Sequence, residues 1–195
     1  MSLEAAVRAT FILITMSVAG VVHISWLRTK LSQRFAWPVD AGMEFRGKRL
    51  FGENKRVCGF MVMPLATALA FMILGGAREE LLPNVLSDAL WNLTPLEYGL
   101  LGMMCGLAFM LAELPNSFIK RQLGIEPGQA PAQSWLRLPV LLIDRYDSVL
   151  GTLLVLSLLV PVPLATWVLV LMLGPVLHAL FSMIMHVIGI KARAL

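Results

Sequence analysis

Three charged residues interrupt one apolar stretch, and their side chains are the best suited to chemistry. Asp144, Arg145 and Asp147 fall within the apolar run 138–160. A charge at the centre of a membrane-spanning helix costs about 2.5–3.5 kcal/mol on insertion scales, so such residues are functional candidates. Asp144 and Asp147 are three residues apart, which places both carboxylates and Ser148 on one helical face. This face suits Mg²⁺, whose remaining ligands are waters and substrate phosphates. The alternative is a structural pair of an Asp with Arg145 or with a basic residue of a neighbouring helix.

A second group of polar residues ends the preceding apolar run. It is the stretch 113–124, which begins at Glu113, contains Asn116, Ser117, Lys120 and Arg121, and ends at Gly124. Lysine offers a point charge and arginine a planar fork for phosphate oxygens, while the amide and the hydroxyl donate neutral hydrogen bonds. The group therefore indicates phosphate binding. The alternative is that the two basic residues are membrane anchors whose charged ends reach the lipid headgroups.

A third group is the glycine-punctuated basic segment 47–59, which contains Arg49 and Lys55. Glycine permits positive φ and a close approach of the backbone, which suits a loop around a phosphorylated ligand. The segment lacks the Gly-Lys-Ser/Thr ending of a Walker A motif. A solvated basic loop that touches lipid is the alternative.

The elements that must position these groups are apolar helices. The sequence of 195 residues is 58% hydrophobic and only 14% charged, whereas a soluble domain has about 25% charged residues. Five apolar runs are each long enough to span a bilayer, and they are continuous rather than alternating, which favours helices over a β-barrel. They lie at about 7–27, 58–77, 96–115, 138–160 and 164–189. We therefore predict an all-α, polytopic transmembrane bundle of about five spans, forming one integral membrane domain over residues 1–195.

The basic residues predict the orientation of this bundle. Most of them fall in the first loop, the third loop and the tail with Lys191 and Arg193, whereas Arg8 and Arg78 lie on the other side beside acidic residues. Loops rich in lysine and arginine stay in the cytoplasm. We expect the N-terminus outside, the C-terminus in the cytoplasm, and all three polar groups facing the cytoplasm from the inner membrane.

Other residues give weaker signals. Cys58 and Cys105 lack the spacing of metal ligands. His23, His178 and His186 are scattered over two spans, so we interpret them as packing or interfacial residues. The net charge of +4, with basic residues beside spans, favours anionic lipid headgroups or phosphorylated ligands and not nucleic acid. No internal repeat supports a transporter built from duplicated halves.

Three motifs together resemble the CDP-archaeol synthase family, small five-helix relatives of the CDP-diacylglycerol synthases. The resemblance covers most of the chain from about residue 46 to 151. Its motifs are Lys48-Arg-Leu-Phe-Gly-Glu-Asn-Lys55, Asn116-Ser-Phe-Ile-Lys-Arg-Gln-Leu-Gly-Ile-Glu-Pro-Gly128 and Ile143-Asp-Arg-Tyr-Asp-Ser-Val-Leu-Gly151.

The resemblance implies roles for individual residues. Asp144 and Asp147 match the paired acids that bind Mg²⁺, and Lys120 and Arg121 match a Lys-Arg pair near the CTP phosphates. Ser117 and Gly124 match the family pattern too, and Lys55 matches a lysine expected to help hold the nucleotide.

The chain also departs from the family pattern. The family loop usually reads Phe-Gly-Asp-x-Lys-Thr-x-Arg-Gly, and here Glu53, Arg56 and Cys58 replace the Asp, Thr and Arg. Ala112-Glu113 replaces the usual Gly-Asp before Asn116, and the stretch 129–138 is longer than expected.

From these observations we predict a cytidylyltransferase that transfers CMP from CTP to a lipid phosphate and releases pyrophosphate. Its partners are CTP, a membrane lipid phosphate and bilayer lipids, with Mg²⁺ as cofactor; whether it forms a homodimer stays open. The alternative is a non-catalytic membrane scaffold or a small transporter. The predicted catalytic residues are Asp144, Asp147, Lys120 and Arg121, with the two acids as metal ligands, and the predicted phosphate-binding residues are Lys55, Asn116, Ser117, Gly124 and Arg49.

Overall fold

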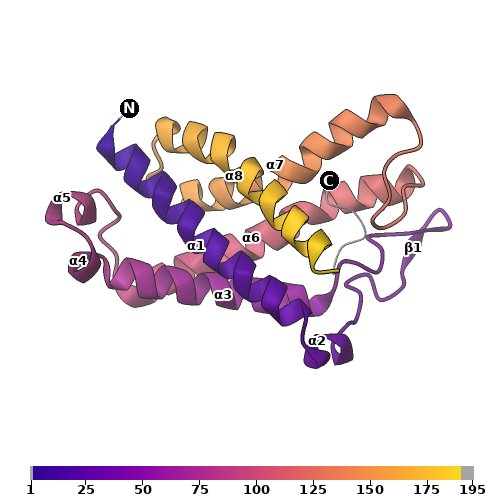
Figure 1. Cartoon of the computed structure of the whole chain (residues 1–195), viewed down its shortest axis with the longest axis horizontal. Coiled ribbons are helices and arrows are strands. Elements are labelled where there is room, and N and C mark those ends of the chain that lie inside the picture. The colour runs from indigo at the N-terminus through magenta and orange to yellow at the C-terminus, as the bar shows by residue number, and fades with distance from the viewer. Residues whose placement is uncertain (1, 190–195) are drawn as a thin grey trace.

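Five long helices dominate the computed structural model, which describes residues 2–189 (Figure 1). They are α1 (Leu3–Leu27), α3 (Val57–Gly76), α6 (Pro95–Gln122), α7 (Ser134–Leu159) and α8 (Leu164–Val187). The shorter elements are α2 (Lys30–Arg34), β1 (Glu44–Phe45), β2 (Lys48–Arg49), α4 (Arg78–Leu81) and α5 (Asn84–Ser87). The prediction of a mostly helical chain is confirmed.

Four of the long helices described here, α1, α3, α6 and α8, are long and apolar enough to cross a membrane. The chain is therefore an integral membrane protein. The helix α7 has the length of a span but carries Asp144, Arg145 and Asp147, which lower its mean hydropathy. The fifth span and the orientation of the termini stay predictions, and Lys191 and Arg193 of the tail lie outside the described residues.

The five long helices form a closed ring. Helix α1 packs against α3 and α8, α3 against α6, α6 against α7, and α7 against α8. Glycines let the backbones approach closely, as is common in membrane helices. A Cβ atom at Gly106 would lie 2.7 Å from the Pro64 Cα, and one at Gly151 would lie 2.4 Å from the Ala112 Cβ. Gly151 is one turn beyond Asp147, so it brings the acidic part of α7 against α6.

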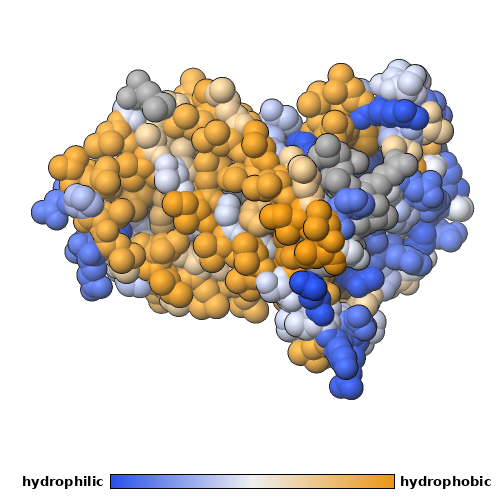
Figure 2. All heavy atoms as spheres, in the orientation of Figure 1, coloured by the Kyte–Doolittle hydropathy of each residue, from blue (hydrophilic) through white to orange (hydrophobic). Residues whose placement is uncertain are grey.

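The two ends of the ring differ in character. We call the end with residues 28–56 and 123–133 the hairpin end, and the end with residues 77–94 and 160–163 the opposite end; they lie at the right and left of Figure 1. Figure 2 shows an apolar surface over the helices and a hydrophilic surface gathered mainly at the hairpin end. The three polar groups of the sequence therefore share one end, as predicted.

The hairpin is the one strand pair in the described part of the chain, and it was not predicted. Strands β1 and β2 are antiparallel, and Arg46 and Gly47 between them have φ of 54° and 72°. Positive φ at both central residues is the signature of a type I′ turn, which matches the twist of the strands.

Asp40 organises the loop that carries this hairpin. Its fully buried carboxylate accepts hydrogen bonds from the Arg49 side chain and from the backbone N–H groups of Gly42, Phe51 and Gly52. Burial alone would raise the pKa of the Asp40 carboxyl, but these hydrogen bonds outweigh it and hold the pKa well below its usual range. Asp40 thus fixes the path of the loop from Gly42 to Gly52.

Helix α6 positions the second polar group. It begins with a capping box between Thr94 and Glu97. It continues beyond the predicted run 96–115, because hydropathy marks only its apolar part. At its C-terminal end the Gly124 N–H donates to the Arg121 carbonyl (3.0 Å), and Gly124 adopts φ of 74°. Glycine favours this conformation at a helix terminus, so Lys120 and Arg121 fall in the last turn.

Candidate active site

A cavity of about 850 Å³ opens inside the ring and reaches the hairpin end. All five long helices and both loops of the hairpin end contribute to its lining. Seven residues predicted from the sequence line it: Lys55, Asn116, Ser117, Lys120, Arg121, Asp144 and Asp147. The structure therefore brings together side chains that are up to 92 positions apart in the chain, from Lys55 to Asp147.

The two acids of α7 converge on one amide of α6. The buried Asn116 donates from Nδ2 to Asp144 Oδ1 at 2.5 Å and to Asp147 Oδ2 at 2.8 Å. The backbone N–H of Ser148 also donates to Asp147 Oδ1 at 2.6 Å. The expectation that both carboxylates share one helical face is confirmed, and Asn116 spans the gap between them.

The basic partner of Asp144 is Lys120 and not Arg145. Lys120 Nζ lies 2.5 Å from Asp144 Oδ1, and both side chains line the cavity. The buried guanidinium of Arg145 instead donates to Ser182 Oγ of α8 at 3.1 Å. Among the ion pairs of residues 2–189, none joins Arg145 to Asp144 or Asp147. The other form of the structural alternative, a pair with a basic residue of a neighbouring helix, is present, because Lys120 of α6 pairs with Asp144 of α7.

Glu113 is a cavity acid that the predicted set of site residues does not include. Its carboxylate forms an ion pair with Lys55, and it lies 3.0 Å from Ser148 Oγ, which is also 3.0 Å from Asp147 Oδ1. The Ser148 hydroxyl can donate to only one of the two carboxylates at a time. A continuous polar chain therefore runs from the first loop through α6 to the acid pair of α7. The signal in the sequence was the position of Glu113, where the family pattern has an acid.

Arg121 is buried, but not all nitrogen atoms of its guanidinium have hydrogen-bond partners. Its exposed fraction is 9%, and its Nε and Nη1 atoms have no hydrogen-bond partner within residues 2–189. The side chain lies between the two loops of the hairpin end, because a Cβ atom at Gly52 would be 3.3 Å from Arg121 Nε and 3.1 Å from Pro127 Cγ. A buried charged donor without a partner is costly, so this group is suited to an anionic ligand.

Two predicted phosphate-binding residues lie outside the cavity lining. Arg49 pairs with Asp40, and Gly124 ends α6. Near Gly124, the Lys48 ammonium donates to the Gln122 carbonyl at 2.6 Å, which satisfies one of the last carbonyls of the helix. These positions give both residues a structural task, and their contact with a nucleotide stays a prediction.

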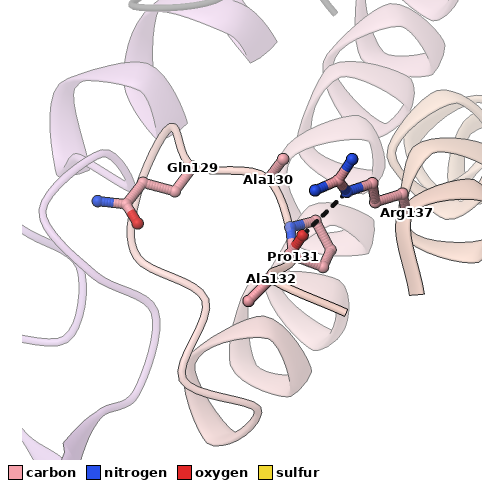
Figure 3. Close-up of a pocket in the computed structure, with 5 residues that line it drawn as sticks. All are labelled: Gln129, Ala130, Pro131, Ala132 and Arg137. Atoms are coloured by element: carbon pink, nitrogen blue, oxygen red, sulfur yellow. Dashed lines mark hydrogen bonds between the residues drawn. The ribbon is translucent and has the colours of Figure 1, made fainter. Parts of the chain in front are cut away.

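The long segment 129–138 adds a second, smaller cavity at the hairpin end. Its volume is about 440 Å³. Figure 3 shows the residues that line it, which are Gln129, Ala130, Pro131, Ala132 and Arg137. The Arg137 Nε donates to the Pro131 carbonyl at 3.2 Å, which ties the loop to the first turn of α7. Gln129, Pro131 and Arg137 also line the large cavity, so this loop borders the polar site.

The carboxylate oxygens that line the cavity suit an Mg²⁺ ion that a bound ligand would also coordinate. Within residues 2–189, no three His, Cys, Asp or Glu side chains form a group that could hold a metal by themselves. Mg²⁺ is usually held by one or two carboxylates, with waters and substrate phosphates as the remaining ligands. Asp144 and Asp147, which converge on Asn116, satisfy this requirement, whereas a closed metal cage made only of protein groups does not fit.

Comparison with known proteins agrees with the motifs. The model of the CarS-like CDP-archaeol synthase family matches residues 34–194. A CDP-archaeol synthase of Thermofilum pendens is 31% identical over 79% of this chain and 64% of its own length. The corresponding protein of Methanoculleus marisnigri is 30% identical over 79% of this chain and 87% of its own length. No solved structure matches significantly. Because the family model covers most of its length and most of the polar motif side chains line one cavity, the chain belongs to the CDP-archaeol synthase family.

Proposed function

We propose that this protein is a Mg²⁺-dependent cytidylyltransferase that transfers CMP from CTP to a lipid phosphate at the cytoplasmic face of the membrane. The names of its relatives support an enzyme that makes a CDP-activated lipid. The four apolar helices support a substrate that stays in the bilayer. The match covers only 64% of the Thermofilum relative. We therefore propose for this chain only the transfer reaction and no further property of that relative.

One observation carries this proposal: the unsatisfied guanidinium of Arg121 borders the cavity that holds the acid pair and Lys120. The buried Arg121 and the half-buried Lys120, beside two convergent carboxylates, suit a ligand that brings both phosphate oxygens and a divalent cation. CTP with Mg²⁺ has this composition. A scaffold would gain nothing from a buried arginine with two unpaired nitrogens, because each unmade hydrogen bond costs about 1–3 kcal/mol.

In the proposed reaction, a phosphate oxygen of the lipid attacks the α-phosphorus of CTP. The new O–P bond forms while the bond between the α-phosphorus and the oxygen leading to the β-phosphate breaks, and pyrophosphate leaves with that electron pair. Lys120 and Arg121 stabilise the negative charge on the triphosphate, and Asn116 holds the two acids in register. Mg²⁺ bound by Asp144 and Asp147 would supply further charge neutralisation. No protein nucleophile is required.

The test is cytidylyl transfer by the purified full-length protein. Labelled CTP, Mg²⁺ and a panel of ether-linked and ester-linked lipid phosphates are incubated with wild-type protein and with the Asp144→Asn and Asp147→Asn variants. We expect a labelled CDP-lipid from at least one lipid, and a loss of rate of about 100-fold or more in each variant. Absence of any product with every lipid would refute the proposed reaction, and fully active variants would refute the role of the acids.

A further inference from the structure

We propose that Arg145 binds the phosphate of the incoming lipid, which makes it the acceptor-binding residue of the site. This inference deepens the proposed function and rests on it, because the proposed reaction supplies the lipid phosphate. The sequence offered Arg145 as one partner of a structural ion pair. In the structure it follows Asp144 on α7 and lines the large cavity.

The guanidinium of Arg145 is buried, and few of its donors are used. The residue has an exposed fraction of 8%, and the one hydrogen bond of its guanidinium within residues 2–189 runs from Nη1 to the Ser182 hydroxyl at 3.1 Å. A guanidinium has five N–H donors. Asp144 is within electrostatic range, but its carboxylate pairs with Lys120. A buried charge that donates only to a neutral hydroxyl is costly, so Arg145 suits an anion that a ligand brings.

Arg145 lies deeper in the helix ring than Arg121. The neighbour of Arg145 in the chain, Asp144, accepts a hydrogen bond from Asn116 of α6, so Asn116 marks the level of this part of α7. Arg121 follows Asn116 by five residues, which is about 7 Å along α6 toward the hairpin end. The cavity therefore has two arginines with unused donors, one near the hairpin end and one farther inside.

Arg145 also lies on a different side of α7 from the acid pair. Successive helical residues are about 100° apart around the axis, so Arg145 reaches α8 while Asp144 faces α6. Apart from His178, the residues of α8 in the cavity lining are apolar, namely Val170, Gly174, Leu177, Phe181 and Met185. Arg145 thus stands where the polar wall formed by α6 and α7 meets the apolar wall formed by α8.

This position suits an amphiphile better than a soluble nucleotide. A lipid phosphate has alkyl chains, which favour an apolar wall, and a charged headgroup, which favours a guanidinium. The nucleotide has no such chains, and Lys120 and Arg121 suit its phosphates nearer the hairpin end. A lipid phosphate on Arg145 would lie next to Asp144, so its attacking oxygen would be close to the proposed Mg²⁺ site.

The test measures binding of each substrate separately, without turnover. Full-length protein in detergent is titrated with a dialkylglycerol phosphate, with a diacylglycerol phosphate, and with CTP and Mg²⁺, and the ligand-induced rise in Tm is converted to affinity. Arg145→Gln and Arg145→Met remove the charge, whereas Arg145→Lys keeps it. Ser182→Ala is the matched control, because it removes the contact to α8 and leaves the guanidinium. The control ligands are the same glycerolipids without phosphate.

We expect Arg145→Gln and Arg145→Met to weaken binding of the lipid phosphate about tenfold or more, which is the size of a hydrogen bond to a charged group. Arg145→Lys should recover part of this affinity, because it keeps a cation without the planar fork. CTP affinity in these variants, and lipid-phosphate affinity in Ser182→Ala, should stay within about threefold of wild type. The Tm of ligand-free Arg145→Gln should stay unchanged or rise, since an incompletely paired buried charge is removed.

Several results would overturn the inference. One is an unchanged lipid-phosphate affinity in Arg145→Gln and Arg145→Met, and another is a wild-type protein that binds neither lipid phosphate. An equal loss for CTP would make Arg145 a nucleotide residue, and an equal loss for the lipid without phosphate would remove the role of the charge. An equal loss in Ser182→Ala, or failure of both charge-removing variants to fold, would make Arg145 structural.

The outcomes distinguish this inference from the proposed function. If Arg145→Gln loses lipid-phosphate affinity but the wild-type protein transfers no CMP, the proposed function fails and the lipid-phosphate site stands. If the wild-type protein transfers CMP and Arg145→Gln binds the lipid phosphate normally, only the role of Arg145 fails.

Discussion

The two ends of the helix ring both contain buried arginines, but they use them differently. Arg8 and Arg78 at the opposite end and Arg121 at the hairpin end each have an exposed fraction of 9%. Burial alone therefore does not distinguish them. Their partners do, because the first two are surrounded by acceptors and the third is not.

At the opposite end the guanidinium groups join segments that are distant in sequence. Arg8 donates to the Ala89 carbonyl (3.1 Å) and to the Pro161 carbonyl (2.9 Å), and it pairs with Glu4 at 2.6 Å. Arg8 also lies over the Trp91 ring, 5.2 Å from its centroid. These contacts tie α1 to the loop before α6 and to the turn between α7 and α8.

Arg78 has a similar set of acceptors. It donates to the carbonyls of Gly75 (3.2 Å) and Leu93 (3.1 Å) and to Glu79 Oε1 (3.1 Å), and it lies over Tyr98. Tyr98 in turn packs with Phe11 in the aromatic core of this end. An arginine satisfied in this way is structural, whereas the partly unsatisfied Arg121 indicates a site completed by a ligand.

Replacing Arg121 is the strongest test of this difference between the two ends. We expect Arg121→Gln to weaken CTP binding about 10- to 100-fold, since it removes a charge-assisted contact to phosphate. Because the guanidinium is partly unsatisfied without ligand, the free energy of unfolding should stay unchanged or rise. Titration with CTP and Mg²⁺, together with thermal unfolding, measures both quantities. If this variant binds CTP with wild-type affinity, Arg121 does not bind the nucleotide, and the proposed difference between the two ends is wrong.

The matched variant at the opposite end is Arg78→Gln. We expect it to lower the free energy of unfolding by about 2 kcal/mol, because the buried Gly75 carbonyl and the partly buried Leu93 carbonyl lose their donor. Thermal unfolding should show a Tm lower by about 4–8 °C, while CTP affinity of the folded protein stays unchanged. A loss of CTP affinity without a loss of stability would contradict the structural role of Arg78.

Two glycines, one near each end, allow the same comparison for helix packing. A Cβ atom at Gly151 would lie 2.4 Å from Ala112 Cβ, and one at Gly75 would lie 2.4 Å from Tyr98 Cδ1. We expect Gly151→Ala and Gly75→Ala each to destabilise the protein by about 1–2 kcal/mol. Only Gly151→Ala should also lower the rate of cytidylyl transfer, because it moves Asp147 away from Asn116. Gly20→Ala, whose Cβ would lie 3.6 Å from the Phe181 ring, is the tolerated control.

The smallest effect concerns pH and the loop at the hairpin end. The lowered pKa of Asp40 means that its contribution to stability is complete above the unfolded pKa of about 3.9 and is lost as the pH falls through the folded pKa. We expect hydrogen-exchange protection of the Gly42, Phe51 and Gly52 amides to be constant from about pH 8 to pH 5 and to decrease only in strong acid. Asp40→Asn should reduce this protection throughout that range. Loss of protection between pH 8 and pH 5 in the wild-type protein would contradict the assignment.

Much of the candidate site could be predicted because its residues break a local pattern. Asp144 and Asp147 interrupt an apolar run, and their spacing by itself puts them on one face. Lys120 and Arg121 follow the apolar run 96–115. Glu113 was noted as a departure from the family pattern but was not included among the site residues, since its partners Lys55 and Ser148 are distant in sequence.

The roles of other residues could not be predicted from residue type alone. Arg49 and Lys55 belong to the same basic segment, yet Arg49 pairs with Asp40 and Lys55 reaches the cavity. His23 and His178 have no meaningful spacing in the chain, so their common cavity depends on how α1 and α8 pack. Gly124 matches a family motif, and the structure adds that it terminates α6.

By itself, the sequence determined that this is a helical membrane protein with its polar chemistry collected at one end, because hydropathy and charge act locally along a chain. Only the tertiary structure decided which charges neutralise one another. Lys120 pairs with Asp144, Lys55 with Glu113 and Arg145 with a serine, while two nitrogens of Arg121 have no partner among the residues that the structure describes. Such pairing depends on distances of a few ångströms between side chains on different helices, and these distances are set by close packing around glycines such as Gly151.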